Sequence, residues 1–330
     1  MYAAARNLRG GVSPRNTRLR GQSIIEYVLI IAIIGLVIVF AGPGVAGAIR
    51  NQFNLVGNTV NSGTSAGTEG GGASGGGSAG ADSATVQAAI AKDAKDWTLE
   101  EQEAVATDIA AKGEASPAYA KAKAAMDAGT KFSIKLTNGQ TMTYRIIGIN
   151  HDGLADGSGK AGLTFLTTST GIKSCMNSGS TNVGGWEKSE LRAKMNSGEI
   201  WNLMPSDFQS KVKSVKKFTN NVSGTDESAL VTATTDKLFL LSNSEIVPAF
   251  GRPSFWDSDY PWISSEGSQY EAFKDIKDKL TGLQIGEDWW ERSVEPSDSE
   301  RFCEFSNNGG GPSACTGAGA SNCVCPAWCF

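Results

Sequence analysis

The pattern of hydrophobic and polar residues changes sharply along the chain. Residues 27–49 are 23 uncharged positions, dense in Ile, Val and Leu as far as Phe40. A helix rises about 1.5 Å per residue, so about 20 such residues cross the roughly 30 Å hydrocarbon layer of a membrane. We therefore expect a transmembrane helix here, which Pro43 kinks or ends.

A low-complexity segment and a helical segment follow. Residues 62–82 are almost wholly Gly, Ser, Ala and Thr, so they have nothing to bury and are predicted to be a flexible linker. In residues 83–130 the spacing is helical, and Thr98 with Glu101 matches a capping box at a helix start. We expect short helices that form a spacer packed on the following domain.

From Phe132 the period becomes that of β-strands. Hydrophobic and polar residues alternate on both sides of Asn138-Gly139, which is the strongest short signal of a β-hairpin. We expect further strands at 163–168, 237–241, from Trp289 and at 324–330, and helices from Trp186, from Pro205 and at 270–280. Helices and strands do not alternate as βαβ units, so the expected fold class is α+β with a mostly antiparallel sheet.

Composition and charge narrow the class of protein. Of the 330 residues, 40% are hydrophobic, which is enough for a folded core. The formal charge of −4 and the scattered lysines argue against a nucleic-acid-binding protein, which needs a basic face. Residues 1–21 carry five arginines and no acid. Arginines on this side of an apolar helix predict a cytoplasmic N-terminus and an exported C-terminal body.

Glu26 helps to distinguish between hypotheses for the role of the apolar segment. A secretory signal peptide could be cut near Ala46-Gly47-Ala48, and a plain single-pass anchor would need no cut. Neither reading explains a carboxylate at the edge of the apolar run, which costs about 2.5 kcal/mol or more at mid-membrane. We therefore expect Glu26 to have a functional role.

The residues around Glu26 carry a family resemblance. Gly21-Gln22-Ser23-Ile24-Ile25-Glu26-Tyr27 resembles the processing site of type IV prepilins, and the Glu-Tyr pair resembles that of the Flp pilins of Tad pili. The resemblance implies that a membrane peptidase cuts after Gly21, so that Gln22 becomes the N-terminus and Glu26 the fifth residue. It covers roughly the first sixty residues, whereas Flp pilins end soon after the helix.

This resemblance also implies how the chain would assemble. The Glu26 carboxylate of one subunit would pair with the Gln22 ammonium of its neighbour, which fixes the register of parallel helices. The implied partners are other pilin subunits, the prepilin peptidase and the pilus assembly machinery. The implied location is the cytoplasmic membrane before assembly and an extracellular pilus or the cell surface afterwards.

A second resemblance concerns the C-terminal part. The residues that carry it are Gly185-Trp186, Ser189, Leu191-Arg192, Asn196, Trp289-Trp290-x-Arg292-Ser293 and Val324-Cys325-Pro326-Ala327. They look like a domain of unassigned function in bacterial surface proteins, with an arrangement similar to C-type-lectin-like and formylglycine-generating-enzyme-like folds. Glu291 replaces the usual apolar residue and Cys325 the usual arginine, and the resemblance implies no activity.

The cysteines indicate a covalent framework. The six are Cys175, Cys303, Cys315, Cys323, Cys325 and Cys329. In an exported body they favour disulfides, although six cysteines permit fifteen pairings and the sequence does not choose among them. The competing reading is zinc, but the spacings Cys-x-Cys and Cys-x-x-x-Cys match the usual paired ligands poorly.

The remaining candidate site is an aromatic and acidic loop. Its residues are Trp256, Asp257, Asp259, Tyr260 and Trp262. They could stack on a glycan or protein ligand and hold calcium, or they could be a loop that covers the core. Apart from that calcium we expect no cofactor or metal. The lysines at 211, 213, 216 and 217 indicate a solvated edge, and His151 indicates a turn.

These observations lead to one main hypothesis. We expect a Tad/Flp-like pilin, a minor or tip subunit, that displays an extracellular domain for adhesion, and no enzymatic activity. The alternatives are a membrane-anchored glycan-binding protein or enzyme that does not polymerise, and a secretion pseudopilin. The expected parts are a leader (1–21), a pilin helix (22–61), a linker (62–82), a helical spacer (83–130) and an extracellular α+β domain (131–330).

Overall fold

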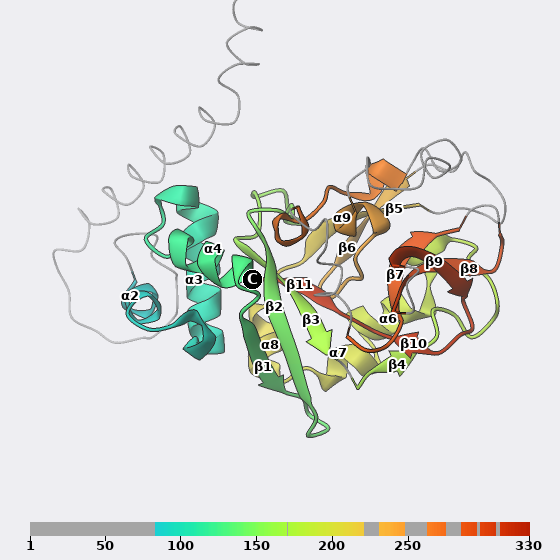
Figure 1. Cartoon of the computed structure of the whole chain (residues 1–330), viewed down its shortest axis with the longest axis horizontal. Helices are drawn as coiled ribbons and strands as arrows, with labels where there is room; N and C mark the ends of the chain where they lie inside the picture. The colour runs from blue at the N-terminus through green and yellow to red at the C-terminus, as the bar shows by residue number, and fades with distance from the viewer. Residues whose placement is uncertain are drawn as a thin grey trace, which may run out of the picture. The chain divides into compact units, whose positions relative to one another are not determined.

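The computed structural model, shown in Figure 1, describes residues 83–169, 171–220, 231–247, 263–274, 285–295, 298–307 and 311–330. All of these belong to the unit Ala81–Phe330. The expected membrane helix and linker lie outside the described residues. Within the ranges given above, no helix has both the length and the apolar character that crossing a membrane requires.

Short helices open the described unit, as the sequence predicts. They are α2 (Ala84–Ile90), α3 (Leu99–Lys112) and α4 (Tyr119–Asp127), with 3-10 turns η1 (Ala94–Asp96) and η2 (Gly113–Ala115) between them. The predicted capping box is confirmed, because the Thr98 hydroxyl accepts from the Glu101 amide and the Glu101 carboxylate accepts from the Thr98 amide. Helix α4 begins at Tyr119.

The first sheet has the strand order β1-β2-β3-β11 and is antiparallel. Its strands are β1 (Lys131–Lys135), β2 (Thr141–Ile149), β3 (Leu163–Ser169) and β11 (Ala327–Cys329). The hairpin predicted at Asn138-Gly139 joins β1 to β2, and Gly139 has a φ of 86°, which an L side chain rarely adopts. The C-terminal strand therefore lies beside β3, as Figure 1 shows.

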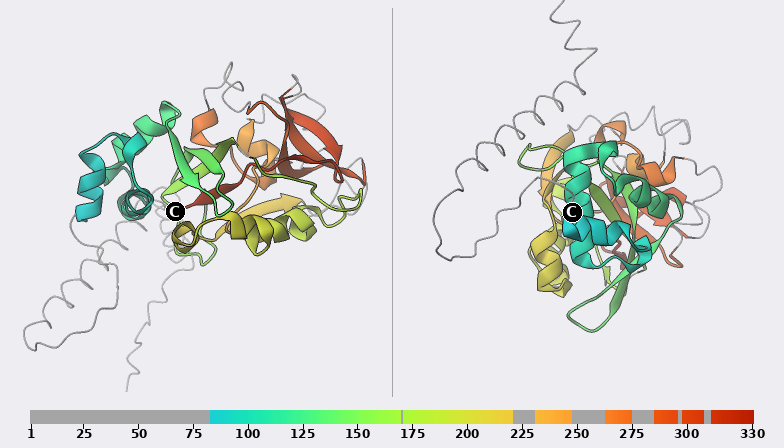
Figure 2. Two further views of the ribbon diagram at one scale, coloured as in Figure 1. Left: turned by 90° about the horizontal axis from the view of Figure 1, so that it is seen from below. Right: turned by 90° about the vertical axis from the view of Figure 1, so that its left-hand side faces the viewer.

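The helices α2, α3 and α4 pack against this sheet and share its hydrophobic core (Figure 2). Trp97 stacks near Phe132, and the Tyr144 hydroxyl donates to Gln102 of α3. Gly162 precedes β3 at the closest approach, where an added Cβ would come within 1.8 Å of a backbone oxygen of α3. The helical spacer and the strands of this sheet thus share one hydrophobic core.

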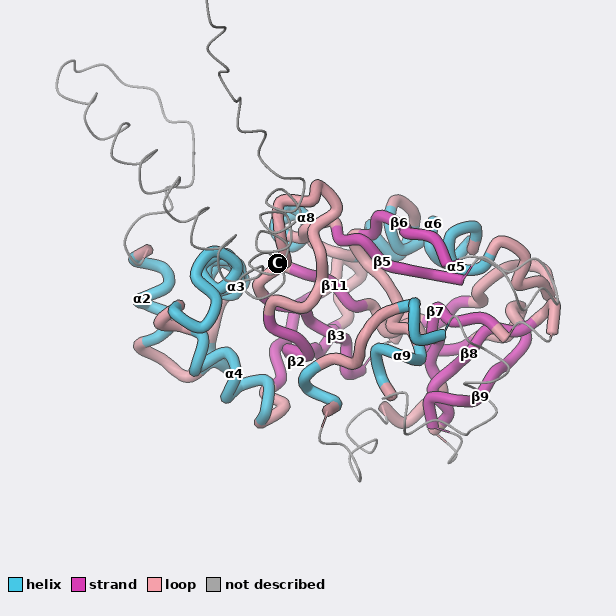
Figure 3. Tube along the Cα trace, turned by 90° about the horizontal axis from the view of Figure 1, so that it is seen from above, coloured by secondary structure: helices cyan, strands magenta, loops and turns pink. Residues whose placement is uncertain are grey.

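The second sheet has the order β4-β10-β7-β8-β9. Its strands are β4 (Lys173–Ser174), β10 (Asn322–Cys323), β7 (Trp289–Val294), β8 (Arg301–Ser306) and β9 (Gly311–Gly317). Every pair is antiparallel except β10 with β7. Figure 3 shows β7, β8 and β9 on the side away from α2, α3 and α4. The expected mixed α+β fold with mostly antiparallel sheets is confirmed for the described part.

Short elements connect the two sheets. The helices are α5 (Gly185–Lys188), α6 (Glu190–Asn196), α7 (Glu199–Leu203), α8 (Ser206–Lys211) and α9 (Asn243–Ile246), with 3-10 turns η4 (Ile263–Glu266) and η5 (Glu271–Phe273). Strands β5 (Val215–Asn220) and β6 (Val231–Asp236) form a separate antiparallel ribbon. Leu191 and Met195 of α6 are fully buried.

One expected strand is wrong. Residues 237–241 make a single bridge, between Phe239 and Ala327, and the strand lies earlier, at β6. The reason is that this segment runs between two hydrophobic clusters. Leu238 and Leu240 pack in one cluster, while Phe239 and Leu241 pack in the other. Successive side chains of this segment therefore point to opposite sides, as in a β-strand, although its backbone forms no continuous strand pairing.

Candidate functional site

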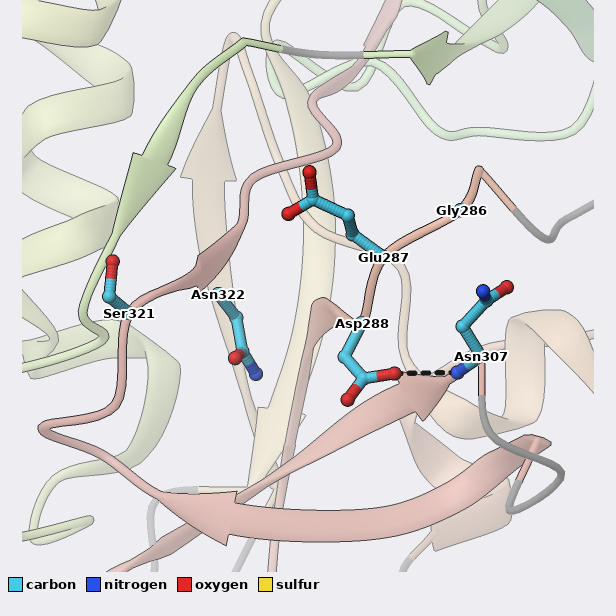
Figure 4. Close-up of a pocket in the computed structure, with 6 residues that line it drawn as sticks. All are labelled: Gly286, Glu287, Asp288, Asn307, Ser321 and Asn322. Atoms are coloured by element: carbon cyan, nitrogen blue, oxygen red, sulfur yellow. Dashed lines mark hydrogen bonds between the residues drawn. The ribbon is translucent and has the colours of Figure 1, made fainter.

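A polar pocket of about 270 Å³ lies at the second sheet (Figure 4). Its lining residues are Gly286, Glu287, Asp288, Asn307, Ser321 and Asn322. They come from three places that are distant in sequence, namely the approach to β7, the end of β8 and the start of β10. The sheet topology brings these ends together, because β7 pairs with both β8 and β10.

Carboxylates and amides dominate the pocket. The backbone N–H of Asn307 donates to Asp288 Oδ1 at 2.6 Å, as the dashed line in Figure 4 marks. Glu287 pairs with Lys173, and this hydrogen bond lowers the pKa of Glu287. The Asn322 side chain donates to Glu304, whose pKa is raised by burial and by the charge of Asp288. The pocket therefore offers acceptors and donors to a hydroxyl-rich solute.

The described residues contain no group of three or more His, Cys, Asp or Glu side chains that could hold a metal ion. The residues that line the pocket offer carboxylate and amide groups for hydrogen bonds.

A second polar cluster is buried between the sheets, which we call the ion network. At its centre the Lys217 ammonium lies 2.7 Å from Asp152 Oδ1 and 2.5 Å from Glu245 Oε1. The Tyr270 hydroxyl donates to Asp152 at 2.9 Å, and Thr164 donates to the same carboxylate at 2.6 Å. Lys217 is thus fully paired inside the protein.

Arg292 of β7 extends the ion network. Its guanidinium forms a two-pronged pair with Glu245, at 2.5 and 3.1 Å, and also donates to the Glu266 carbonyl. The Glu266 carboxylate accepts from the Ser293 hydroxyl and from the backbone N–H of Asn220. One network therefore ties β5, α9, η4 and β7 to the loop after β2.

The electrostatics of the ion network follow from burial and pairing. Burial alone would raise the pKa of Asp152, but the Lys217 charge overcomes burial and leaves the pKa well below its ordinary value. Burial is likewise outweighed at Glu245, whose pKa is lowered by Arg292 and Lys217. Burial lowers the pKa of Lys217, but Asp152 and Glu245 reverse this and raise it. All three groups are charged at neutral pH.

Glu291 of β7 behaves in the opposite way. It is fully buried, and burial raises its pKa well above the ordinary value, although the Asn243 amide lowers it in part. Glu266 and Glu304 add to the rise. Glu291 therefore remains protonated at pH values where most glutamates are charged.

The ion network is closed to solutes. Its members are at most 4% exposed, and the His151 ring stacks on Tyr270 with centroids 4.0 Å apart. The His151 side chain also faces Glu271 at 3.4 Å, so it covers one side of the network. A buried network without access holds elements in place, and the polar pocket is therefore the candidate site for a ligand.

The structure describes some of the site residues predicted from the sequence and not others. Gly21, Gln22, Glu26 and Tyr27 lie outside the described residues, and so do the five residues of the aromatic and acidic loop. All six cysteines are described as free thiols. Of these, Cys303 and Cys315 lie opposite each other on β8 and β9, with sulfurs 3.1 Å apart.

The expectation of a solvated lysine edge is wrong for Lys217. It is 2% exposed, whereas its neighbour Lys216 points outward. The alternation along β5 turns Val215, Lys217 and Thr219 inward, so the period of two could have revealed it. Asp152, Glu245 and the pocket residues were also missed, since isolated acids and turn residues give no local signal.

The comparisons with known proteins concern this C-terminal part. Neither the curated proteins nor the solved structures give a match to the chain. A family of protein domains matches residues 161–329, just over half of the chain, and this range includes the pocket and most of the ion network. The chain therefore belongs to the family described as Domain of unknown function (DUF6273).

Proposed function

We propose that the chain is a Tad/Flp-like type IV pilin, a minor or tip subunit, which assembles through its N-terminal helix and displays residues 81–330 for adhesion. The observation that carries the proposal is Glu26, five places after Gly21 and directly before 23 uncharged residues. An acid at that place costs free energy in lipid unless a partner compensates it. A neighbouring subunit's Gln22 ammonium would supply that partner.

The sequence supports display outside the membrane, because the Gly- and Ser-rich residues 62–82 separate the expected helix from the folded unit. If a Gly/Ser-rich stretch of about 20 residues behaves as a flexible linker, it spans roughly 25 Å on average. We further propose a C-type-lectin-like role for the unit, with the polar pocket as the ligand site.

The test of processing is the N-terminus of the protein taken from cell envelopes. A start at Gln22 supports the pilin. A start at Met1 indicates a simple anchor, and a start near residue 49 indicates a secreted product; either of these overturns the proposal.

The test of assembly is Glu26→Ala, with Glu69→Ala in the linker as the matched control. We expect Glu26→Ala to insert into membranes normally but to enter sheared fibres about tenfold less, the effect of losing about 1.4 kcal/mol. Glu69→Ala should enter fibres as the parent does. Equal incorporation of both variants would remove Glu26 from assembly.

The polar pocket also favours a second candidate function, that of a membrane-anchored glycan-binding protein that does not polymerise. Its carboxylates and amides suit hydroxyl-rich ligands. Glycan-array binding by the chain and by Asp288→Asn tests this candidate. Binding that requires Asp288, together with a start at Met1, would favour it over the pilin.

A further inference from the structure

We infer that Cys303 and Cys315 form a disulfide bond that fastens strand β9 to strand β8. The two residues are direct partners in the antiparallel register of these strands. Side chains of direct partners leave the same face of a sheet, and their Cα atoms lie about 4.5 to 5.5 Å apart. That separation falls within the roughly 4.4–6.8 Å range of disulfides.

The positions of the sulfurs agree with this register. The Sγ atoms are 3.1 Å apart, so about 1 Å of side-chain movement would bring them to the bonding distance of about 2.05 Å. The backbone can stay where it is. Neither strand needs to change its hydrogen-bonded ladder.

The register also reduces the choice of pairings. The sequence alone leaves fifteen, and fixing Cys303 with Cys315 leaves the three that four cysteines permit. Two of the remaining cysteines have polar contacts of their own. The Cys329 sulfur contacts the Thr164 hydroxyl, and the Cys323 sulfur contacts Glu287.

The solvent exposure of the two cysteines determines which of them reacts first. Cys303 is fully buried, and Cys315 is half-buried. An oxidant therefore reaches Cys315 first. The hydrogen bond with Cys315 raises the pKa of Cys303, and burial raises it further, so Cys303 keeps its proton until the attack begins.

The reaction requires an electron acceptor, which we take to be the disulfide of a thiol–disulfide oxidoreductase. The Cys315 thiolate attacks that disulfide, forms a mixed disulfide and releases one thiol of the oxidoreductase. Cys303 loses its proton and attacks the Cys315 sulfur, which releases the second thiol. The two cysteines lose two protons and two electrons, and the oxidoreductase gains the electrons as a dithiol.

The bond would matter most at β9. This strand is at the end of the order β4-β10-β7-β8-β9, so it is paired in its sheet only with β8. Strand β8 also carries Glu304, which binds Asn322 of the polar pocket. A covalent link fixes the edge of the sheet next to that pocket.

The inference rests on the proposed function in one respect, because export supplies the oxidising compartment. The experiment therefore has two arms. In the first, free thiols of the full-length chain are alkylated before lysis, and a non-reduced digest is analysed by mass spectrometry. We expect a peptide pair linked through Cys303 and Cys315. In the second, the purified, reduced chain is equilibrated with oxidised glutathione before the same digest.

The outcomes separate the two proposals. A Cys303–Cys315 link in both arms supports the disulfide. A link with glutathione but not in cells supports the pairing and counts against export, and hence against the proposed function. Alkylation of both thiols after glutathione treatment, or a link of Cys315 to another cysteine, overturns the inference.

Variants give an independent readout. Cys315→Ala should lose the linked peptide and lower the Tm of the oxidised chain by about 6–12 °C, as expected for closing a loop of roughly 15 residues in a protein of this size. Cys175→Ala, at another half-buried cysteine, should retain the link. Equal Tm values for oxidised wild type and Cys315→Ala would contradict a closed bond.

Discussion

Two buried regions of the unit are stabilised in opposite ways. Beneath α3, the first sheet packs rings on rings, with Phe165 at 5.6 Å from Tyr144 and 5.8 Å from Trp328 between centroids. Between the sheets, by contrast, a second hydrophobic cluster also encloses the charges of the ion network. The first region depends on shape and apolar area, and the second depends on the presence of every partner.

The difference lies in how each region responds to a missing group. Removing part of a ring leaves a cavity, whose cost depends on how far the neighbours relax. Removing one charge from the ion network leaves its partner buried and uncompensated. The aromatic region can therefore exchange residues of similar size, whereas the ion network specifies which elements meet.

The largest expected effect comes from Lys217→Met. Methionine keeps most of the volume but leaves Asp152 and Glu245 without the cation that lies 2.7 and 2.5 Å away. We expect the free energy of unfolding to fall by about 3–5 kcal/mol. Urea unfolding followed by tryptophan fluorescence measures this, because every tryptophan lies at residue 97 or beyond.

The matched control is Lys216→Met, on the same strand but facing outward. It should change the free energy of unfolding by less than about 0.5 kcal/mol. The gap between wild type and Lys217→Met should also shrink below about pH 4. Asp152 and Glu245 have lowered pKa values in the folded wild type, so their contribution is present above the unfolded pKa values, about 3.9 and 4.3, and is lost as the pH falls. Equal losses in the two variants would mean that Lys217 is solvated.

The elements of the first region could be predicted from the sequence far better than the contacts of the second. The Asn138-Gly139 turn and the alternation around it identify β1 and β2 because local backbone preference and burial agree. Likewise, the Thr98 and Glu101 pair identifies the start of α3. Signals of this kind lie within a few residues of the element that they specify.

The ion network and the pocket depend on contacts that are distant in sequence. Lys217 pairs with Asp152, which lies 65 residues away in the sequence. The other lysines near Lys217 led to the prediction of a solvated edge. Residues 311–317 form β9, but their Gly, Pro and Ser content is typical of a loop. The pocket residues are turn formers singly, and only the pairing of β7 with β8 and β10 gathers them.

Glu291→Gln is expected to have an effect of the opposite sign. The raised pKa of Glu291 means that the folded state holds a proton that the unfolded state releases above about pH 4.3. Stability therefore falls as the pH rises from there towards the folded pKa. Glutamine removes this loss, so at pH 7 the variant should be more stable than the wild type.

Urea unfolding at pH 4 and pH 7 tests this prediction. The two proteins should differ little at pH 4, where Glu291 holds its proton in both states, and most at pH 7. Glu304→Gln is the comparison, because the hydrogen bond from Asn322 offsets part of the effect of burial and the pKa of Glu304 is raised to a smaller extent. A variant that is less stable than wild type at pH 7 would show that Glu291 is a charged member of the ion network.

The smallest expected effect is in the region that the sequence describes best. Thr98→Ala removes the hydroxyl that accepts from the Glu101 amide at 3.2 Å, and we expect a loss of about 1 kcal/mol in the free energy of unfolding. Thr98→Ser keeps the hydroxyl and should stay within about 0.5 kcal/mol of wild type. The two variants measured together by urea unfolding isolate the cap from side-chain packing, because Thr98 is exposed. A loss in Thr98→Ser equal to that in Thr98→Ala would show that the threonine methyl group, and not the cap, stabilises the start of α3.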